Sequence, residues 1–298
     1  MTNNVEATAG TARAVMITGA STGIGRACAL YLDRRGWRVF AGVRKQADAD
    51  AIAKDATPQL TPVTFDVTDE PSIKRAAETI SKVLDDRPLN GLVNNAGIAL
   101  GGPVEFLSLS EFRRQLEVNL VGQLAVTQAF LPSIRRGPGR IVNISSIGGR
   151  SATPFLSPYN ASKYALEALS DCMRAELKPW GIDVAIIEPG AIQSTIWDKA
   201  RNLVTDITDA LPPEGIRLYG NEIERMSKII QTQEQIAVPA ERVAKAVEHA
   251  LTASRPRIRY IVGADAWAVA AMRWLLPDRI HDWAMDLVLR QMSARSAR

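Results

Sequence analysis

Cysteine and histidine are scarce in this sequence, which has two of each among its 298 residues. Cys28 and Cys172 both fall in stretches with helical periodicity, and neither lies near a histidine along the chain. We therefore expect no metal site, and we interpret both cysteines as small buried apolar residues. A chain of this length with so few cysteines does not depend on disulfides, which is typical of an intracellular protein.

The sequence also lacks a leader and a strong charge of one sign. Residues 1–12 are mostly small and polar, without the basic start and apolar run of a secretion signal or the roughly 20 apolar residues of a membrane anchor. We expect a flexible N-terminal tail there and a cytoplasmic protein. The net charge of +4, from 36 basic and 32 acidic residues, is too small to indicate a nucleic acid partner.

Apolar runs alternate with helical patterns from Arg13 to about Val262, with no linker between them. The patterns predict strands at 15–17, 38–43, 62–65, 90–94, 139–144, 182–187 and 259–262, and helices at 25–35, 49–56, 71–85, 111–136 and 239–251. This alternation predicts an α/β fold: a Rossmann-type doubly wound parallel sheet with helices on both faces, in one domain over residues 13–263. Ligands of such sheets bind beyond the carboxyl ends of the strands.

A glycine-rich loop follows the first predicted strand and opens a predicted helix. It reads Thr18-Gly19-Ala20-Ser21-Thr22-Gly23-Ile24-Gly25. Glycines permit a tight turn and a close approach of backbone to ligand, and the free N–H groups of a helix start suit a pyrophosphate. The loop predicts a nucleotide site, with a plain turn as the alternative. Its spacing is G-x-x-x-G-x-G rather than the commoner G-x-G-x-x-G.

Tyr159 and Lys163 stand one helical turn apart, on the same face of a predicted helix. A free phenol holds its proton until about pH 10, so near neutrality it is a poor base. A cation one turn away lowers the pKa of the phenol toward the range that is useful for proton transfer. The pair alone is also compatible with a solvated surface pair.

A set of motifs, taken in their order along the chain, resembles the motifs of the classical short-chain dehydrogenases/reductases. They are Gly19/Gly23/Gly25, Asn94-Asn95-Ala96-Gly97, Asn119, Ser146, Tyr159, Lys163 and Pro189-Gly190. The resemblance covers residues 14–190 with full motifs and the remainder more loosely. Several features in the right order are far more specific than any one of them alone.

The resemblance implies a nicotinamide dinucleotide cofactor, held at the ends of successive strands. Asp66 and Val67 are similar to the pair that contacts adenine in this family, with a turn or helix-capping role as the alternative for Asp66. The cofactor-binding residues that we expect besides this pair are Gly19, Ser21, Thr22, Gly23, Ile24, Gly25, Asn95, Ala96, Gly97, Tyr159, Lys163, Pro189, Gly190, Ile192 and Thr195.

The choice between NAD and NADP depends on the end of the second predicted strand. A carboxylate there binds the ribose hydroxyls of NAD, whereas an arginine pairs with the extra phosphate of NADP. That strand ends in Val43-Arg44-Lys45, so Arg44 favours NADP(H) over NAD(H). The alternative is a solvated surface arginine, since Thr22 does not supply the second basic residue that some NADP enzymes of the family have.

The resemblance also implies catalytic roles for Asn119, Ser146, Tyr159 and Lys163. Ser146 holds the substrate oxygen, and Tyr159 exchanges a proton while hydride moves to or from the nicotinamide. Lys163 lowers the pKa of the phenol and binds the nicotinamide ribose, and Asn119 anchors a water that relays protons. Ser145 is a rival to Ser146, and a solvent-facing helix position is the alternative for Asn119.

The sequence predicts the function of two further regions less specifically than that of the motifs above. Residues 191–237 mix Pro, Gly and apolar residues and predict a mobile lid over the substrate, with a structural loop as the alternative. Residues 264–298 predict an apolar and basic helical extension. Four roles are open for this extension: it is part of the core, it closes over a bulky apolar substrate, it packs against a second subunit, or it contacts a membrane surface.

These features predict an NADP-preferring oxidoreductase that interconverts an alcohol and a carbonyl compound on a bulky apolar small molecule. The tail and the Glu188-Pro189-Gly190 segment resemble the branch of the family that acts on steroids and retinoids. We expect a homodimer or a homotetramer. The alternative function is a catalytically silent NADP-binding sensor; a sugar-nucleotide epimerase is disfavoured by the glycine spacing.

Overall fold

A seven-stranded sheet forms the centre of the computed structural model, which describes residues 12–194 and 196–295. The strands are β1 (Ala14–Ile17), β2 (Arg38–Val43), β3 (Leu60–Thr64), β4 (Gly91–Asn94), β5 (Arg140–Ile144), β6 (Asp183–Pro189) and β9 (Arg259–Val262). Their order is β3-β2-β1-β4-β5-β6-β9, and each neighbouring pair is parallel. The predicted fold class, a doubly wound parallel sheet, is confirmed.

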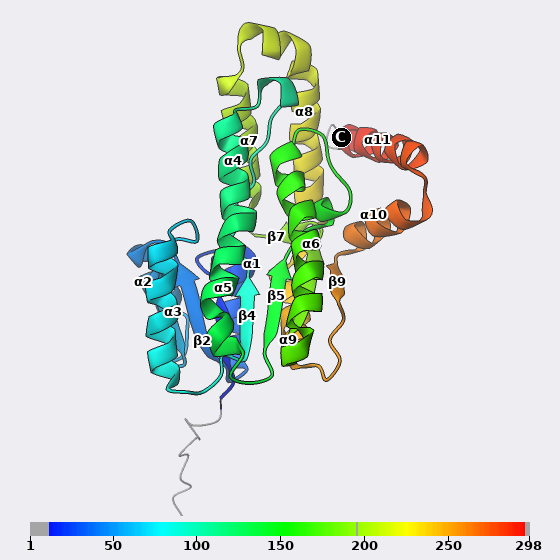
Figure 1. Cartoon of the computed structure of the whole chain (residues 1–298). Helices are drawn as coiled ribbons and strands as arrows, with labels where there is room; N and C mark the ends of the chain where they lie inside the picture. The colour runs from blue at the N-terminus through cyan, green and yellow to red at the C-terminus, as the bar shows by residue number, and fades with distance from the viewer. Residues whose placement is uncertain (1–11, 195, 296–298) are drawn as a thin grey trace, which may run out of the picture.

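Helices cover both faces of this sheet (Figure 1). One face carries α1 (Gly23–Arg34), α2 (Gln46–Ala53) and α9 (Ala240–Thr252), and the other carries α3 (Glu70–Leu84), α5 (Gly122–Ile134) and α6 (Ser157–Leu177). Because side chains alternate along a strand, Val15 and Ile17 of β1 enter the first core, whereas Ala14 and Met16 enter the second. Both cores are apolar, as expected for a parallel sheet that is buried on both sides.

The chain reverses its direction of winding at β1, which lies between β2 and β4. Ile17 at the end of β1 pairs with Ala41 on one side and with Val93 on the other. The loops after these strands therefore emerge at one edge of the sheet, on both sides of the point where the strand order reverses. Ligands of open α/β sheets bind at such a point.

The predicted helix over 111–136 is observed as three consecutive segments. They are α4 (Leu109–Leu116), a π-helical turn η2 (Glu117–Val121) and α5. Asn119 lies in the wide turn and is buried. Single π-helical turns of this kind are frequent at functional sites. The prediction of one regular helix is wrong at this turn.

Residues 191–237 form helices rather than an irregular loop. A short parallel pair, β7 (Ile192–Gln193) and β8 (Val238–Pro239), brackets α7 (Ile196–Ala210) and α8 (Pro213–Ile236). Figure 1 shows both helices above the carboxyl edge of the sheet. They share a small core of their own, which includes Trp197, Ile207, Ile223, Met226 and Ile230.

The C-terminal residues form α10 (Ala264–Leu275) and α11 (Asp278–Arg295), at the β9 edge of the sheet (Figure 1). α11 packs along α8, where the Thr232 hydroxyl donates to the carbonyl of Met292 at 2.9 Å. Three tryptophans of this extension stay exposed: Trp267 (57%), Trp274 (85%) and Trp283 (66%). Within the described residues, no helix is both long and apolar enough to cross a bilayer.

Three short 3₁₀ turns complete the fold: η1 (Val104–Phe106), η3 (Ile147–Gly149) and η4 (Lys178–Trp180). Of the two cysteines, Cys28 is buried in α1, but Cys172 is exposed, so its expected burial is wrong. α6 buries Leu166, Ser170, Met173 and Leu177, and Cys172 lies off that face of the helix.

A chain of charges lies between α6, β6 and β9. The carboxylate of Glu188 is fully buried and is contacted by Arg150 Nε at 2.8 Å and by Arg259 Nε at 3.3 Å. Arg259 also pairs with Glu167 at 3.0 Å and with Asp171 at 2.8 Å. Burial, with the nearby charge of Glu167, raises the pKa of Glu188 to about 7. Because this folded-state pKa lies above the ordinary value, ionisation of Glu188 weakens the fold as pH rises toward 7.

Arg259→Met is expected to lower the free energy of unfolding by about 3–5 kcal/mol, because it leaves Glu167 without its cation and the buried Glu188 with Arg150 alone. The loss should be larger at pH 8 than at pH 5, where Glu188 keeps its proton. Urea unfolding at the two pH values measures it. Arg290→Met is the control: its pair with Asp286 at 2.8 Å is solvent-exposed, so about 0.5 kcal/mol or less is expected. Equal effects of the two substitutions would contradict the prediction.

Candidate active site

The glycine loop between β1 and α1 is tightly built. Gly19 and Gly23 have positive φ angles of 65° and 58°, which side chains rarely adopt. A Cβ on Gly25 would lie 2.3 Å from the carbonyl oxygen of Gly19 and 2.4 Å from the amide nitrogen of Asn95. Gly25 therefore lets the first turn of α1 pack directly against the loop and the end of β4.

Asn95 and Ala96, at the end of β4, hold this loop in place. The Asn95 amide Nδ2 donates to the carbonyls of Thr18 at 2.9 Å and Gly19 at 3.1 Å. The backbone N–H groups of Asn95 and Ala96 both donate to the Thr18 hydroxyl at 2.9 Å. The Asn95 side chain thus stabilises the conformation of the glycine loop, a function that the sequence analysis missed.

The first turn of α1 fits a pyrophosphate. Its N-cap residue Thr22 is exposed, and its side chain makes no hydrogen bond to the helix start. Ser21, Gly23 and Ile24 are only partly buried beside it. Backbone N–H groups at the positive end of a helix are suited to an anionic ligand.

Ser146, Tyr159 and Lys163 come together at the carboxyl end of β5. Ser146 Oγ accepts from Gly148 N–H at 3.1 Å and lies beside the phenol of Tyr159, whose pKa it lowers. Lys163 Nζ lies 5.8 Å from the centroid of the Tyr159 ring. Lys163 Nζ donates to the carbonyl of Ile144 at 2.8 Å. The hydroxyl of the rival, Ser145, is buried and has no hydrogen-bond partner among the described residues. The geometry thus favours Ser146 as the partner of the tyrosine.

Burial shifts the pKa values of this pair in opposite directions. Desolvation raises the pKa of Tyr159, and the hydrogen bond from Ser146 only partly opposes this shift. Desolvation lowers the pKa of Lys163 to about 8, and the charge of Glu167 opposes it. The net pKa of Tyr159 thus lies above its ordinary value, because the cost of burying a phenolate is the largest cause of the shift. The lowering of this pKa by Lys163 stays a prediction.

Asn119 is buried and acts as a clamp on the loop after β4. Its Oδ1 accepts from Ile98 N–H at 2.9 Å, and its Nδ2 donates to the Ile98 carbonyl at 2.9 Å and to the Ser162 hydroxyl at 3.2 Å. The solvent-facing alternative is therefore wrong. Gln115 supports the same loop, because it bonds to the Ile98 carbonyl at 2.8 Å and to Leu100 N–H at 2.7 Å.

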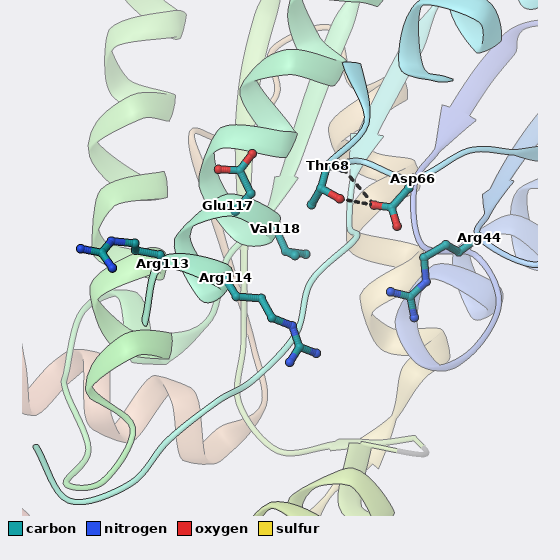
Figure 2. Close-up of a pocket in the computed structure, with 7 residues that line it drawn as sticks. All are labelled: Arg44, Asp66, Thr68, Arg113, Arg114, Glu117 and Val118. Atoms are coloured by element: carbon teal, nitrogen blue, oxygen red, sulfur yellow. Dashed lines mark hydrogen bonds between the residues drawn. The ribbon is translucent and has the colours of Figure 1, made fainter. Parts of the chain in front are cut away.

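A pocket of about 420 Å³ lies beside the ends of β2 and β3. Asp66 lines it, and its Oδ1 accepts from the backbone and hydroxyl of Thr68 at 2.9 and 2.8 Å, which is the turn role that was the alternative. The neighbouring Val67 is half-buried. The residues that line the pocket are Arg44, Asp66, Thr68, Arg113, Arg114, Glu117 and Val118 (Figure 2). The sequence analysis found only Arg44 and Asp66.

Pro189 and Gly190 end β6, next to β9 and α10. Gly190 N–H donates to the carbonyl of Val262 at 2.9 Å, and Asp265 accepts from Ala191 N–H at 2.7 Å. A Cβ on Gly190 would lie 2.2 Å from the Asp265 carboxylate, so this glycine makes room for the acid. Ile192 follows in β7 and is buried, and the predicted cofactor residue Thr195 lies outside the described residues.

The family model described as short chain dehydrogenase matches residues 13–204. The chain belongs to the short-chain dehydrogenases/reductases. It is an oxidoreductase of this family, and the resemblance to the retinol and hydroxysteroid branch is confirmed. The neighbouring structures and relatives indicate a nicotinamide cofactor.

Relatives of this short-chain dehydrogenase match almost its whole length. It is 34% identical to the NADPH-dependent 3-dehydrocapnine reductase of Ornithobacterium rhinotracheale, over 95% of this chain and 100% of the relative. It is 39% identical to Retinol dehydrogenase 16 of Homo sapiens, over 90% and 87%. A short chain dehydrogenase from Burkholderia cenocepacia, solved in complex with NADP, superposes with a TM-score of 0.69 at 28% identity, over 93% and 97%.

Gly25→Ala in this dehydrogenase is expected to weaken nicotinamide cofactor binding by about tenfold or more. Its methyl group must displace the glycine loop from Asn95, and overpacking of this kind costs about 1–3 kcal/mol. Calorimetric titration with NADP⁺ and NAD⁺ measures the loss. Gly220→Ala in α8 is the control, since its backbone is helical and a Cβ there meets only Ile216 Cγ2 at 3.8 Å, and cofactor affinity should stay unchanged. Undiminished binding by Gly25→Ala would contradict the packing argument.

Proposed function

We propose that this enzyme interconverts a secondary alcohol and a ketone, or a primary alcohol and an aldehyde, on a bulky apolar substrate, with NADP(H) preferred over NAD(H). The observation that carries this proposal is that Ser146 lies beside the phenol of Tyr159 and lowers its pKa, with Lys163 one turn along the same helix. A protein that only sensed the cofactor would have no use for a phenol paired in this way.

The residues of the site divide the work of a carbonyl reduction. When bound, the nicotinamide supplies the hydride. Ser146 holds the substrate oxygen by a hydrogen bond, and Tyr159 donates a proton to it. The phenol of Tyr159 is protonated at neutral pH, as a proton donor must be, and a positive charge beside it brings its raised pKa back toward the range that suits proton transfer. Lys163 stabilises the phenolate that remains, and Asn119 fixes α6 through Ser162.

Aromatic side chains above the sheet support an apolar substrate. The rings of Phe106 and Phe155 contact Tyr219 of α8 edge-on, at 6.0 and 6.2 Å between centroids. Together they join η1, the loop before α6 and the α7–α8 pair into one apolar wall, and we assign to residues 191–237 the function of a substrate lid. The retinol dehydrogenase among the relatives is named for a substrate of this class.

Three features support NADP(H) as the preferred cofactor. Arg44 stands at the end of β2 and lines the pocket with Asp66. One relative is named as NADPH-dependent, and one solved relative was crystallised with NADP. Within this proposal, Pro189, Gly190, Ile192 and Thr195 cover the nicotinamide end, and Asp66 and Val67 the adenine end.

Assembly and location remain predictions. A homodimer or homotetramer would bury part of the exposed surface of α10 and α11, where Trp267, Trp274 and Trp283 lie. The same tryptophans would serve peripheral membrane contact, and cytoplasmic location is compatible with both. The silent cofactor sensor remains the alternative function.

Tyr159→Phe is expected to lower kcat for ketone reduction by about 100- to 10,000-fold, the range for loss of a general acid. NADPH absorbance at 340 nm, against a panel of apolar ketones and alcohols, measures turnover. Tyr164→Phe on the same helix is the matched control, because Tyr164 is exposed and should leave turnover within about twofold. Turnover that survives in Tyr159→Phe would refute the proton-transfer role, and no turnover by the wild type with any substrate would favour the sensor.

The rate of reduction is expected to fall as pH rises through about 8, because Lys163 loses its charge there and no longer stabilises the phenolate. Glu167→Gln should move this limb to lower pH, since the Glu167 carboxylate raises the pKa of Lys163. Profiles of kcat against pH for both proteins test this. A limb that moves upward, or does not move, would refute the assignment of the limb to Lys163.

A further inference from the structure

Two guanidinium groups reach the pocket at the end of β2 from elements that are distant in the sequence. Arg44 comes from the end of β2, and Arg114 comes from α4. Figure 2 shows both side chains extending toward the same side of the pocket, whereas Arg113, which also lines the pocket, extends in another direction. Within the described ranges, neither the Arg44 nor the Arg114 guanidinium makes a hydrogen bond or an ion pair.

The acids of this pocket do not neutralise these two cations. Asp66 is engaged by Thr68, and Figure 2 shows Glu117 directed away from Arg44 and Arg114. Two positive charges beside the same pocket repel each other, so an anion bound between them lowers the electrostatic energy. A guanidinium also matches a phosphate in geometry, because its planar fork donates two parallel hydrogen bonds.

The backbone that carries Arg114 is held firmly. The adjacent Gln115 is buried and bonds to Ile98 and Leu100, and Asn119 bonds to Ile98 one turn later. These bonds tie α4 to the loop after β4, and that loop is tied to the glycine loop through Asn95. The starting point of the Arg114 side chain is therefore fixed relative to the proposed cofactor site.

We propose that Arg114 is a specificity residue which, with Arg44, binds the 2′-phosphate of NADP(H). It supplies from α4 the second cation that Thr22 of the glycine loop does not provide. This inference rests on the proposed NADP(H) preference and adds to it a residue on the far wall of the pocket. Contact with the adenine ring, which NAD and NADP share, is the competing role for this side chain.

Calorimetric titration of the full chain with NADP⁺ and NAD⁺ tests the proposal, with Arg114→Ala, Arg114→Lys, Arg44→Ala and Arg113→Ala. Arg114→Ala should weaken NADP⁺ binding by about tenfold or more and leave NAD⁺ binding within about twofold, because only NADP⁺ carries the 2′-phosphate. Arg114→Lys keeps the charge but loses the fork, so a smaller loss is expected. Arg113→Ala removes the same charge from the same helix and should affect NADP⁺ much less.

The ratio of the two affinities separates the outcomes, since damage to the fold would weaken both cofactors. Equal weakening of NADP⁺ and NAD⁺ by Arg114→Ala would overturn the phosphate contact and assign the side chain to adenine. A loss with Arg44→Ala but not with Arg114→Ala would overturn the inference and leave the NADP preference intact. A wild type that binds NADP⁺ no better than NAD⁺ would overturn the preference itself.

Discussion

The hydrogen bonds between the ends of β1 and β4 are the constraint on which the rest of the site depends. The Thr18 hydroxyl and the Asn95 amide close the gap between two parallel strands at the point where the chain reverses its winding. They leave the glycine loop with one shape, which only a residue without a side chain can complete at Gly25. Asn119 then extends the same network to α6, because it links Ile98 to Ser162. The proposed nucleotide and proton-transfer residues thus share one rigid support.

Burial dominates the electrostatics of the pair on α6. In water a lysine one turn from a tyrosine would favour the phenolate, but both groups are here removed from solvent. The phenol then keeps its proton more strongly and the ammonium holds its proton less strongly.

Polar contacts also connect this site to the later parts of the chain. Glu188 just before Pro189 joins Arg150, which follows η3, to Arg259 of β9. Ser151 lies 3.2 Å from the ring of His281, a buried histidine of α11. The C-terminal helices are thereby fixed both to α8 and to the segment that follows Ser146.

The sequence by itself determined the alternation of strands and helices, the parallel sheet and the order of the motifs. These features depend on local periodicity and on residue types, such as glycine in a tight turn, whose conformational preference does not depend on residues far away in the sequence. It also indicated Ser146 over Ser145, because spacing along one strand and helix decides which hydroxyl meets Tyr159.

Only the tertiary structure decided which charges meet and how far each group is buried. Arg114 looks like an ordinary exposed helix residue in the sequence, and only the fold brings α4 beside the segments that follow β2 and β3, where Arg114 lines the same pocket as Arg44. The raised pKa of Tyr159 and the hydrogen bonds of Asn119 and Gln115 to the loop after β4 likewise could not be predicted from the sequence. Desolvation and long-range hydrogen bonds depend on distances between segments far apart in the chain. Local periodicity in the sequence does not predict those distances.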